Sequence, residues 1–242
     1  MLKQATRLGA KVINVEISAV NFSEHPFRLT SGSSRIYTAG SVIVATGARA
    51  RWLGLPSETR YVGRGVSGCA TCDGFFFRGR EVSVIGGGDS AAEDALFLTK
   101  FASKVYLVHR RDKLRSNFRL QEKLRANPKV EIVYEHTLEE ITGNGKVTGI
   151  NLRHIRTGQP RRIETPGVFI AIGHDPATGI FKDQLNLDDS GYIVTDCSTA
   201  TSVYGVFAAG DVMDPNYKQA VVAAGSGCKA AMEALEYLEE LK

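Results

Sequence analysis

Two cysteines stand two residues apart in Ser67–Gly79, "SGCATCDGFFFRG", and an acid directly follows the second of them. A Cys-x-x-Cys pair can form half of a zinc site, or it can cycle between a dithiol and a disulfide. In disulfide exchange one thiolate, Cys69 or Cys72, attacks, and its neighbour resolves the mixed disulfide. Asp73 could supply or accept the proton that this exchange moves. The stretch therefore indicates either redox or metal chemistry.

A zinc site would need a second pair of ligands at a compatible spacing. Cys197 and Cys228 are single and far apart, and no pair of histidines accompanies them. The ligand count therefore favours a redox dithiol and predicts no metal. We interpret Cys197 and Cys228 as small buried hydrophobic residues, and Phe75, Phe76 and Phe77 as core or hinge packing.

The composition is that of a protein with a sizeable core. The chain has 242 residues, of which 43% are hydrophobic and 23% charged, enough for one large domain or two small ones. The net charge of +4 is unevenly spread, because Lys100–Lys129 holds ten Lys or Arg and two acids. Such a segment can bind nucleic acid, a membrane surface or a small phosphorylated ligand.

The N-terminal residues "MLKQATRLGAKV" have no apolar core of signal-peptide length. Apolar runs such as "SVIVATGA" are far shorter than the ~20 residues that span a bilayer. We therefore expect a cytoplasmic protein without membrane contact, in a compartment where thiols stay reduced unless they cycle.

A glycine turn predicts a nucleotide site. In "VSVIGGGDSAAE" a Gly-x-Gly-x-x-Ala follows an apolar strand and opens a helix, which is the context that the dinucleotide fingerprint requires. Gly86 makes the tight turn, Gly88 lets a pyrophosphate approach the backbone, and Ala91 permits close packing of helix on strand. Asp89 and Ser90 lie at the start of the helix, whose free N–H groups would bind the phosphates.

The end of the next strand predicts which nucleotide binds. An NAD site usually has an acid about 20 residues after the glycines, whereas this chain has His109, Arg110, Arg111 and Arg115. Guanidinium groups suit a ribose 2′-phosphate, which an acid would repel. We therefore predict NADPH, which also accounts for the basic segment without nucleic acid.

Strands and helices alternate along the chain. Strands are expected at residues 11–18, 41–47, 81–88, 104–111, 130–134, 137–143, 146–154, 167–173 and 205–211. Helices are expected at 89–101, 116–127 and 217–241, the last one bent or broken near Gly225 and Gly227. Asn144-Gly145 predicts a hairpin turn. The order predicts an α/β fold with a parallel sheet and an added β-meander.

Five segments together resemble the low-molecular-weight thioredoxin reductase family: "CATCDGFFFRG", "VIGGGDSAAE", "HRRDKLR", "GVFAAGDVMD" and "KQAVVAAGSGCKAA". The resemblance covers essentially the whole chain. It implies a two-domain FAD/NAD(P)-binding, Rossmann-like flavoprotein disulfide reductase fold. The NADPH domain with the Cys-x-x-Cys, residues 56–176, would be inserted in an FAD domain formed by 1–55 and 177–242.

The resemblance also implies roles for single residues. Cys72 would face the flavin, Cys69 would exchange with thioredoxin, and Asp73 would be the acid/base. NADPH would be held by Gly86, Gly88, Asp89, Ser90, Ala91, His109, Arg110, Arg111 and Arg115. FAD would be lined by Thr46, Gly47, Gly210, Asp211, Gln219 and Ala220. Electrons would pass from NADPH through FAD and the dithiol to thioredoxin, in a homodimer.

The sequence departs from the family in one respect. The family opens with a strand–GxGxxG–helix that holds the FAD pyrophosphate, and this sequence has one such fingerprint, in its NADPH part. The first ninety or so family residues, with the first βαβ segment of the FAD domain, have no counterpart. We therefore expect exposed apolar faces, an exposed sheet edge, NADPH binding and little FAD.

Three alternative functions stay open. The first is a truncated, non-catalytic NADPH-binding protein. The second is the flavin subunit of alkyl hydroperoxide reductase, against which the arginine cluster argues, because that system uses NADH. The third is a thioredoxin-reductase-like ferredoxin reductase, against which the dithiol argues.

Overall fold

The chain divides into two units in the computed structural model, which describes residues 2–242. Met1–Arg49 and Asp175–Lys242 form what we call the outer unit, and Ala50–His174 form the inserted unit. The unit boundaries fall in the short strands β5 (Ala48–Ala50) and β14 (His174–Pro176). That the two units are an FAD domain and an NADPH domain stays a prediction.

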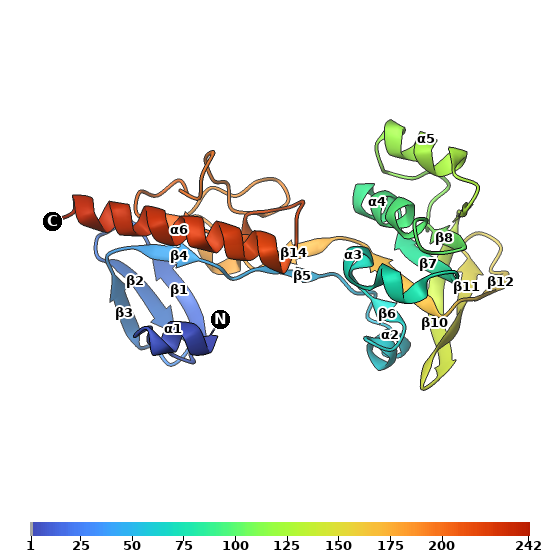
Figure 1. Ribbon diagram of the computed structural model, residues 1–242, viewed down its shortest axis with the longest axis horizontal. Helices are drawn as coiled ribbons and strands as arrows, with labels where there is room; N and C mark the ends of the chain where they lie inside the picture. Colours follow the sequence, from blue (N-terminus) through green and yellow to red (C-terminus); the bar gives the residue numbers. More distant parts are fainter. Residues whose placement is uncertain (1) are drawn as a thin grey trace. The chain divides into compact units, whose positions relative to one another are not determined.

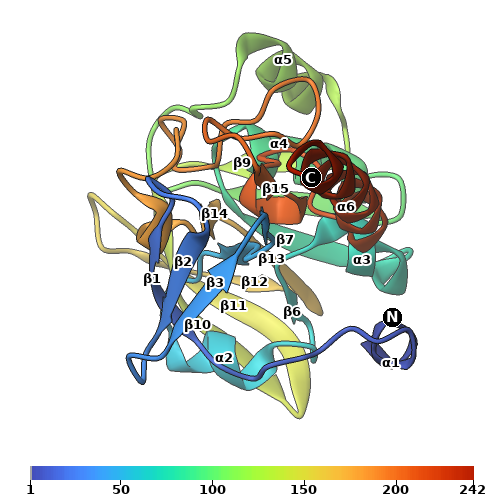
Figure 2. The same ribbon diagram turned by 90° about the vertical axis from the view of Figure 1, so that its left-hand side faces the viewer.

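The inserted unit is built on a five-stranded sheet in the order β6-β13-β7-β8-β9, whose strands are labelled between the two views (Figures 1 and 2). Its neighbouring strands are all parallel. The strands are β6 (Val66–Ser67), β7 (Glu81–Gly86), β8 (Lys104–Val108), β9 (Val130–Val133) and β13 (Gly167–Ala171). Parallel strands are covered on both faces, and Val82, Val84 and Leu107 are accordingly fully buried.

Helices cover one face of this sheet. They are α3 (Ala70–Asp73), η1 (Gly74–Phe77), α4 (Asp89–Leu98) and α5 (Phe118–Ala126). Their apolar residues form one core with the strands, including Ala91, Ala95, Leu98 and Leu124. Asn117 is the N-cap of α5, and its side chain accepts the Leu120 N–H at 3.0 Å.

The other face carries the predicted meander. β10 (His136–Asn144), β11 (Lys146–His154) and β12 (Pro160–Glu164) are antiparallel, and α2 (Pro56–Tyr61) packs beside them. The predicted hairpin is confirmed, because Gly145 connects β10 to β11 with a φ of 72°, which glycine adopts without strain.

The outer unit contains two small sheets. α1 (Leu2–Arg7) precedes an antiparallel sheet of β1 (Ile17–Asn21), β2 (Phe27–Ser31) and β3 (Ile36–Ala39). β4 (Val42–Val44) pairs in parallel with β15 (Val206–Ala208), and the short helices η2 (Gly179–Phe181) and η3 (Gly210–Val212) flank them. The long helix α6 (Ala220–Glu240) lies along β4 and β15 (Figures 1 and 2).

The predicted strand at residues 11–18 is wrong over most of its length. β1 begins only at Ile17, and Val12, Ile13 and Val15 are exposed. Alternation of apolar residues predicts a strand, but a strand also needs a neighbour for its backbone groups. Among the described residues no strand pairs with residues 11–16, where Glu16 C=O alone accepts a backbone N–H from another segment, that of Gly32 at 3.0 Å.

α6 is continuous through Gly225 and Gly227, so a break there is wrong, and the alternative of a bend stays a prediction. Its inner face packs through Ala230, Ala234 and Tyr237, which are buried. Its opposite face exposes an apolar stripe that includes Val221, Cys228, Met232 and Leu235. We call these four residues the α6 stripe.

β4 has one unpaired edge within residues 2–242. The Val42 N–H donates to Gly205 C=O at 3.1 Å, and the Ala209 N–H donates to Val44 C=O at 2.9 Å. The backbone N–H and C=O groups of alternate residues in a strand point to opposite edges. Those of Val42 and Val44 point to β15, so those of Ile43 point to the edge away from β15. An exposed edge and an exposed stripe are what the sequence predicted for the outer unit.

Within the described residues, no helix combines the length and the apolar character that crossing a bilayer requires.

Candidate redox and nucleotide sites

Cys69 and Cys72 form a disulfide at the start of α3. Cys69 caps the helix, and its Sγ accepts the Cys72 N–H at 3.1 Å. The Ser67 Oγ accepts the Cys69 N–H at 3.0 Å and fixes the entry into the turn. The structure therefore brings the two predicted redox residues together, with Asp73 as the last residue of the same helical turn.

The surroundings of this disulfide differ from expectation. Cys72 is exposed and Cys69 is half-buried. Phe75 and Phe76 are 59% and 78% exposed, so their assignment to core packing is wrong. Phe77 alone of the three packs inward, with its ring centroid 5.5 Å from that of Phe169. An aromatic surface thus follows the disulfide directly in the chain.

Asp94 is an acid that the sequence analysis missed. It lies on α4, one helical turn before Leu98, which packs against Gly74 behind the disulfide helix. Burial, with a smaller contribution from Glu93, raises the pKa of Asp94 to about 6. Its only sequence signal is an acid inside an alanine-rich helix.

The nucleotide turn joins β7 to α4. A Cβ on Gly86 would lie 2.3 Å from Ala171 O and 2.6 Å from the Ala91 Cβ, so both positions need small residues. Gly88 caps α4, and a Cβ there would meet no atom within 4 Å. Gly86 and Ala91 therefore serve close packing, and Gly88 faces open space at the helix N-terminus.

Asp89 and Ser90 open α4. The Asp89 Oδ1 accepts the Asn117 N–H at 2.7 Å and the Asn117 Nδ2 at 3.2 Å. Its carboxylate thus holds the start of α5 beside the turn. Ser90 is exposed at the helix N-terminus.

His109 lies underneath the turn. Its ring is so close to Gly87 that a Cβ there would lie 2.1 Å from Nδ1, and Nδ1 is 3.1 Å from Gly86 O. Burial lowers the pKa of His109, the Gly86 and Lys113 carbonyls oppose this shift, and the charges of Arg115 and Arg111 add to it. A neutral imidazole thus supports the turn from below.

Arg110, Arg111 and Arg115 are exposed. The Arg115 N–H donates to Gly87 C=O at 2.7 Å, so this arginine is tied to the glycine turn. Within residues 2–242 none of the three guanidinium groups forms an ion pair with an acid. Three unneutralised cations beside an open helix N-terminus suit a phosphorylated ligand.

The outer unit has a cavity of about 430 Å³ at the N-terminus of α6. It is lined by Ala45, Gly47, Ala209, Gly210, Asp211, Lys218, Gln219, Ala220, Ala223 and Gly227. Five of the six residues expected at FAD line it. Thr46 lies between two lining residues and donates its Oγ1 hydrogen to Ala177 C=O at 2.8 Å.

Comparison with known proteins decides the family. The model of the family "Pyridine nucleotide-disulphide oxidoreductase" matches residues 3–227. The thioredoxin reductase of Rickettsia bellii is 48% identical over 244 residues, which cover 99% of this chain and 79% of that protein. That of Streptomyces coelicolor is 48% identical over 242 residues, 100% of this chain and 75% of the relative.

The chain belongs to the thioredoxin reductase family.

Solved structures agree with this assignment. The thioredoxin reductase from Giardia duodenalis superimposes with a TM-score of 0.95 at 42% identity, covering 98% of this chain and 79% of that one. The thioredoxin reductase from Streptococcus pyogenes superimposes with a TM-score of 0.92 at 40% identity, covering 98% of this chain and 78% of that one. The predicted FAD/NAD(P)-binding, Rossmann-like fold is thereby confirmed.

The chain spans about four fifths of these thioredoxin reductases. Since 244 matched residues are 79% of the Rickettsia bellii protein, about 65 of its residues lie outside the match. This is fewer than the ninety or so that the resemblance implied.

Three residues of the outer unit differ from the sequence-based expectation or lie outside it. Cys197 and Cys228 are exposed, so their assignment as buried hydrophobic residues is wrong. Lys218 lines the α6 cavity, and burial lowers its pKa while Asp214 and Asp211 oppose the shift. Its only sequence signal is its position directly before Gln219.

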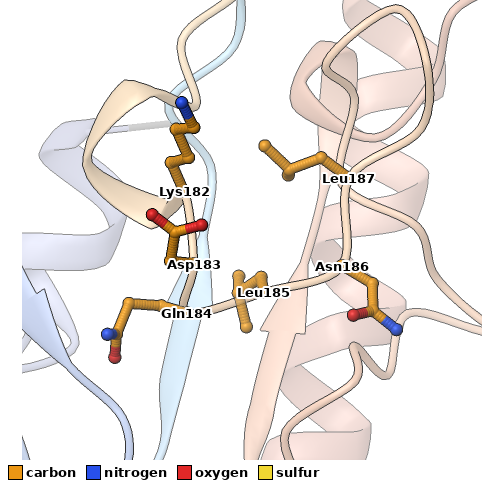
Figure 3. Close-up of a pocket in the computed structure, with 6 residues that line it drawn as sticks. All are labelled: Lys182, Asp183, Gln184, Leu185, Asn186 and Leu187. Atoms are coloured by element: carbon orange, nitrogen blue, oxygen red, sulfur yellow. The ribbon is translucent and has the colours of Figure 1, made fainter.

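A second cavity of the outer unit, of about 480 Å³, is lined by six consecutive residues after η2, Lys182–Leu187 (Figure 3). None of the residues expected at a site lines it. Among residues 2–242, no group of three or more His, Cys, Asp or Glu is placed so that it could hold a metal ion.

Proposed function

We propose that this chain is an NADPH-dependent thioredoxin-disulfide reductase that passes electrons through FAD and the Cys69–Cys72 disulfide to thioredoxin. The observation that carries the proposal is this disulfide, closed within one helical turn beside Asp73. Family membership supports the same activity.

The chain's own part of the reaction is thiol–disulfide exchange. Two electrons break the Cys69–Cys72 bond and leave a thiolate and a thiol, for which one proton is needed. The Cys69 thiolate attacks one sulfur of the thioredoxin disulfide and displaces the other as a thiolate. Cys72 then attacks Cys69, re-forming the disulfide and releasing reduced thioredoxin, with Asp73 holding the proton that Cys72 loses.

The glycine turn and the arginines would hold NADPH. Gly88 lets the pyrophosphate reach the N-terminus of α4, and Arg110, Arg111 and Arg115 would bind the 2′-phosphate. The nicotinamide, when bound, would supply a hydride.

The cavity at α6 fits part of FAD. Gly47 and Gly210 take φ values of 74° and 75°, and the free N–H groups of α6 start at Ala220 on the cavity wall. Gln219, Asp211 and Lys218 add polar contacts. FAD, when bound, would accept the hydride and pass its electrons to the disulfide.

The exposed aromatics would provide the docking surface for thioredoxin. Phe75 and Phe76 follow the disulfide within four residues, and large exposed apolar side chains mark protein contacts. We also propose, from the family, a homodimer in the cytoplasm.

Nucleotide choice can be tested at the arginines. We expect Arg110→Ala or Arg111→Ala to weaken NADPH binding by about tenfold or more, because each removes a charge-assisted hydrogen bond of about 1.5–3 kcal/mol. NADH binding should barely change. Titration of both nucleotides measures this, and equal losses would show that the arginines do not bind the 2′-phosphate.

Thioredoxin reduction after FAD is added distinguishes the proposed enzyme from the alternative of a non-catalytic NADPH-binding protein. We expect residues 1–242, expressed alone, to bind NADPH but to purify largely without FAD. The Gly-x-Gly-x-x-Ala of these residues lies in the inserted unit, whereas the α6 cavity lies in the outer unit. A visible absorption spectrum and an assay of thioredoxin reduction before and after adding FAD measure this. A yellow preparation with stoichiometric flavin would contradict the expectation.

A further inference from the structure

Glu135 has a left-handed backbone conformation, with a φ of 56°. This conformation is unfavourable for any residue with a Cβ, and glycine or asparagine usually takes it. Glu135 lies between β9 and β10, where the chain leaves the parallel sheet for the meander. A strained conformation persists only where surrounding contacts hold it.

The main chain of this turn is bonded to the segment that carries the arginines. The Glu135 N–H donates to Arg111 C=O at 3.2 Å, and the His136 N–H donates to His109 C=O at 3.1 Å. On its other side, Glu135 C=O accepts the Ile155 N–H at 2.8 Å. The turn therefore links the arginine segment to the end of β11.

The carboxylate of Glu135 holds the turn from the side. Its Oε2 lies 2.7 Å from Arg156 Nη2 and 3.7 Å from His154 Nε2. The His154 Nδ1 accepts the Thr157 N–H at 3.2 Å, so Nε2 is the nitrogen that bears a hydrogen and faces the carboxylate. The Glu135 side chain is 21% exposed, which shields the ion pair from solvent in part.

We propose that Glu135 is a positioning residue for NADPH, acting through the backbone of Arg111. The proposal rests on the proposed role of the arginines. The guanidinium of Arg111 must be correctly placed to bind the 2′-phosphate. The main chain of Arg111 is fixed by its bond to the Glu135 turn, and the Glu135 ion pair holds this turn in its strained backbone conformation. NADH lacks this phosphate, so its binding does not depend on the turn.

Two substitutions separate the side chain from the backbone. In the full chain, Glu135→Ala should weaken the binding of NADPH and of 2′,5′-ADP by about fivefold or more, while the affinity for NADH should change by less than about twofold. Glu135→Gly should recover most of this loss, because glycine adopts the left-handed turn without strain. Titration of the three nucleotides gives the dissociation constants, and thermal unfolding is followed in parallel.

The ion-pair partner provides a second test. The Arg156 side chain is 73% exposed. Arg156→Ala should also weaken NADPH binding, but by less than Glu135→Ala does. The double variant should bind NADPH as tightly as Glu135→Ala alone, because both substitutions remove the same interaction. Glu139→Ala is the matched control, since Glu139 pairs with Arg153 on the same meander without bonding to the arginine segment. Glu139→Ala should leave the dissociation constants of all three nucleotides unchanged.

The outcomes distinguish the two proposals. If Arg111→Ala weakens NADPH and Glu135→Ala does not, the positioning role is wrong and the arginine site stands. If Arg111→Ala also has no effect, the arginine site itself is wrong. Equal weakening of NADPH and NADH by Glu135→Ala would show a general loss of structure and would overturn the positioning role.

Discussion

Cys69→Ser and Cys72→Ser are each expected to reduce NADPH-dependent thioredoxin reduction to background in flavin-loaded protein. A serine hydroxyl cannot form the disulfide that accepts two electrons, and either substitution breaks the pair that α3 holds together. NADPH binding should stay within about twofold of the parent, because the glycine turn lies elsewhere in the inserted unit. An assay of thioredoxin reduction and an NADPH titration on the same samples measure both.

Cys197→Ser and Cys228→Ser are the matched controls, since both cysteines are free thiols and exposed. They should keep full activity. Turnover by both Cys69→Ser and Cys72→Ser would show that this disulfide is not the redox centre, whatever nucleotide binds.

Gly86→Ala and Gly88→Ala are expected to differ in their effect on stability although they are two residues apart. A methyl group at Gly86 would overlap the carbonyl of Ala171 on β13, which belongs to the sheet and cannot move aside. We expect the free energy of unfolding to fall by about 2–4 kcal/mol. Nucleotide binding would be lost with the fold of the turn.

At Gly88 a methyl group would meet no protein atom, so stability should change by less than about 1 kcal/mol. It would instead occupy the space that a pyrophosphate needs, and NADPH should bind about tenfold more weakly or worse. Urea unfolding and NADPH titration of both variants test this. Unchanged NADPH affinity in a folded Gly88→Ala would place the pyrophosphate elsewhere.

Local sequence signals predicted the inserted unit well, because each motif there is satisfied by its near neighbours. The Asn144-Gly145 turn, the strand before Gly86 and the disulfide all lie where the sequence indicates. The five predicted residues that line the α6 cavity came from the family resemblance, since they lie far apart in the chain.

Three of the failures have one physical cause. Val12 in the first predicted strand, Phe76 and Cys228 all have the apolar character of core or strand residues, and all are exposed. Hydrophobicity shows that a residue would gain by burial, but it does not show whether a neighbouring element covers it. The left-handed conformation of Glu135 could not be predicted from the sequence, because no propensity favours an acid in such a turn.

The main chain of the arginine segment is bonded at both ends and at Arg111, whose C=O accepts the Glu135 N–H. The His109 N–H donates to Val133 C=O at 2.9 Å, and the Arg115 N–H donates to Gly87 C=O at 2.7 Å. The anchors of residues 110–115 are therefore main-chain atoms, which other sequences of the same length supply, while the side chain of Leu114 is buried in the core. Coenzyme specificity could be re-engineered by grafting this segment from an NADH-using relative with an apolar residue kept at Leu114, without altering the glycine turn that binds the part common to both coenzymes.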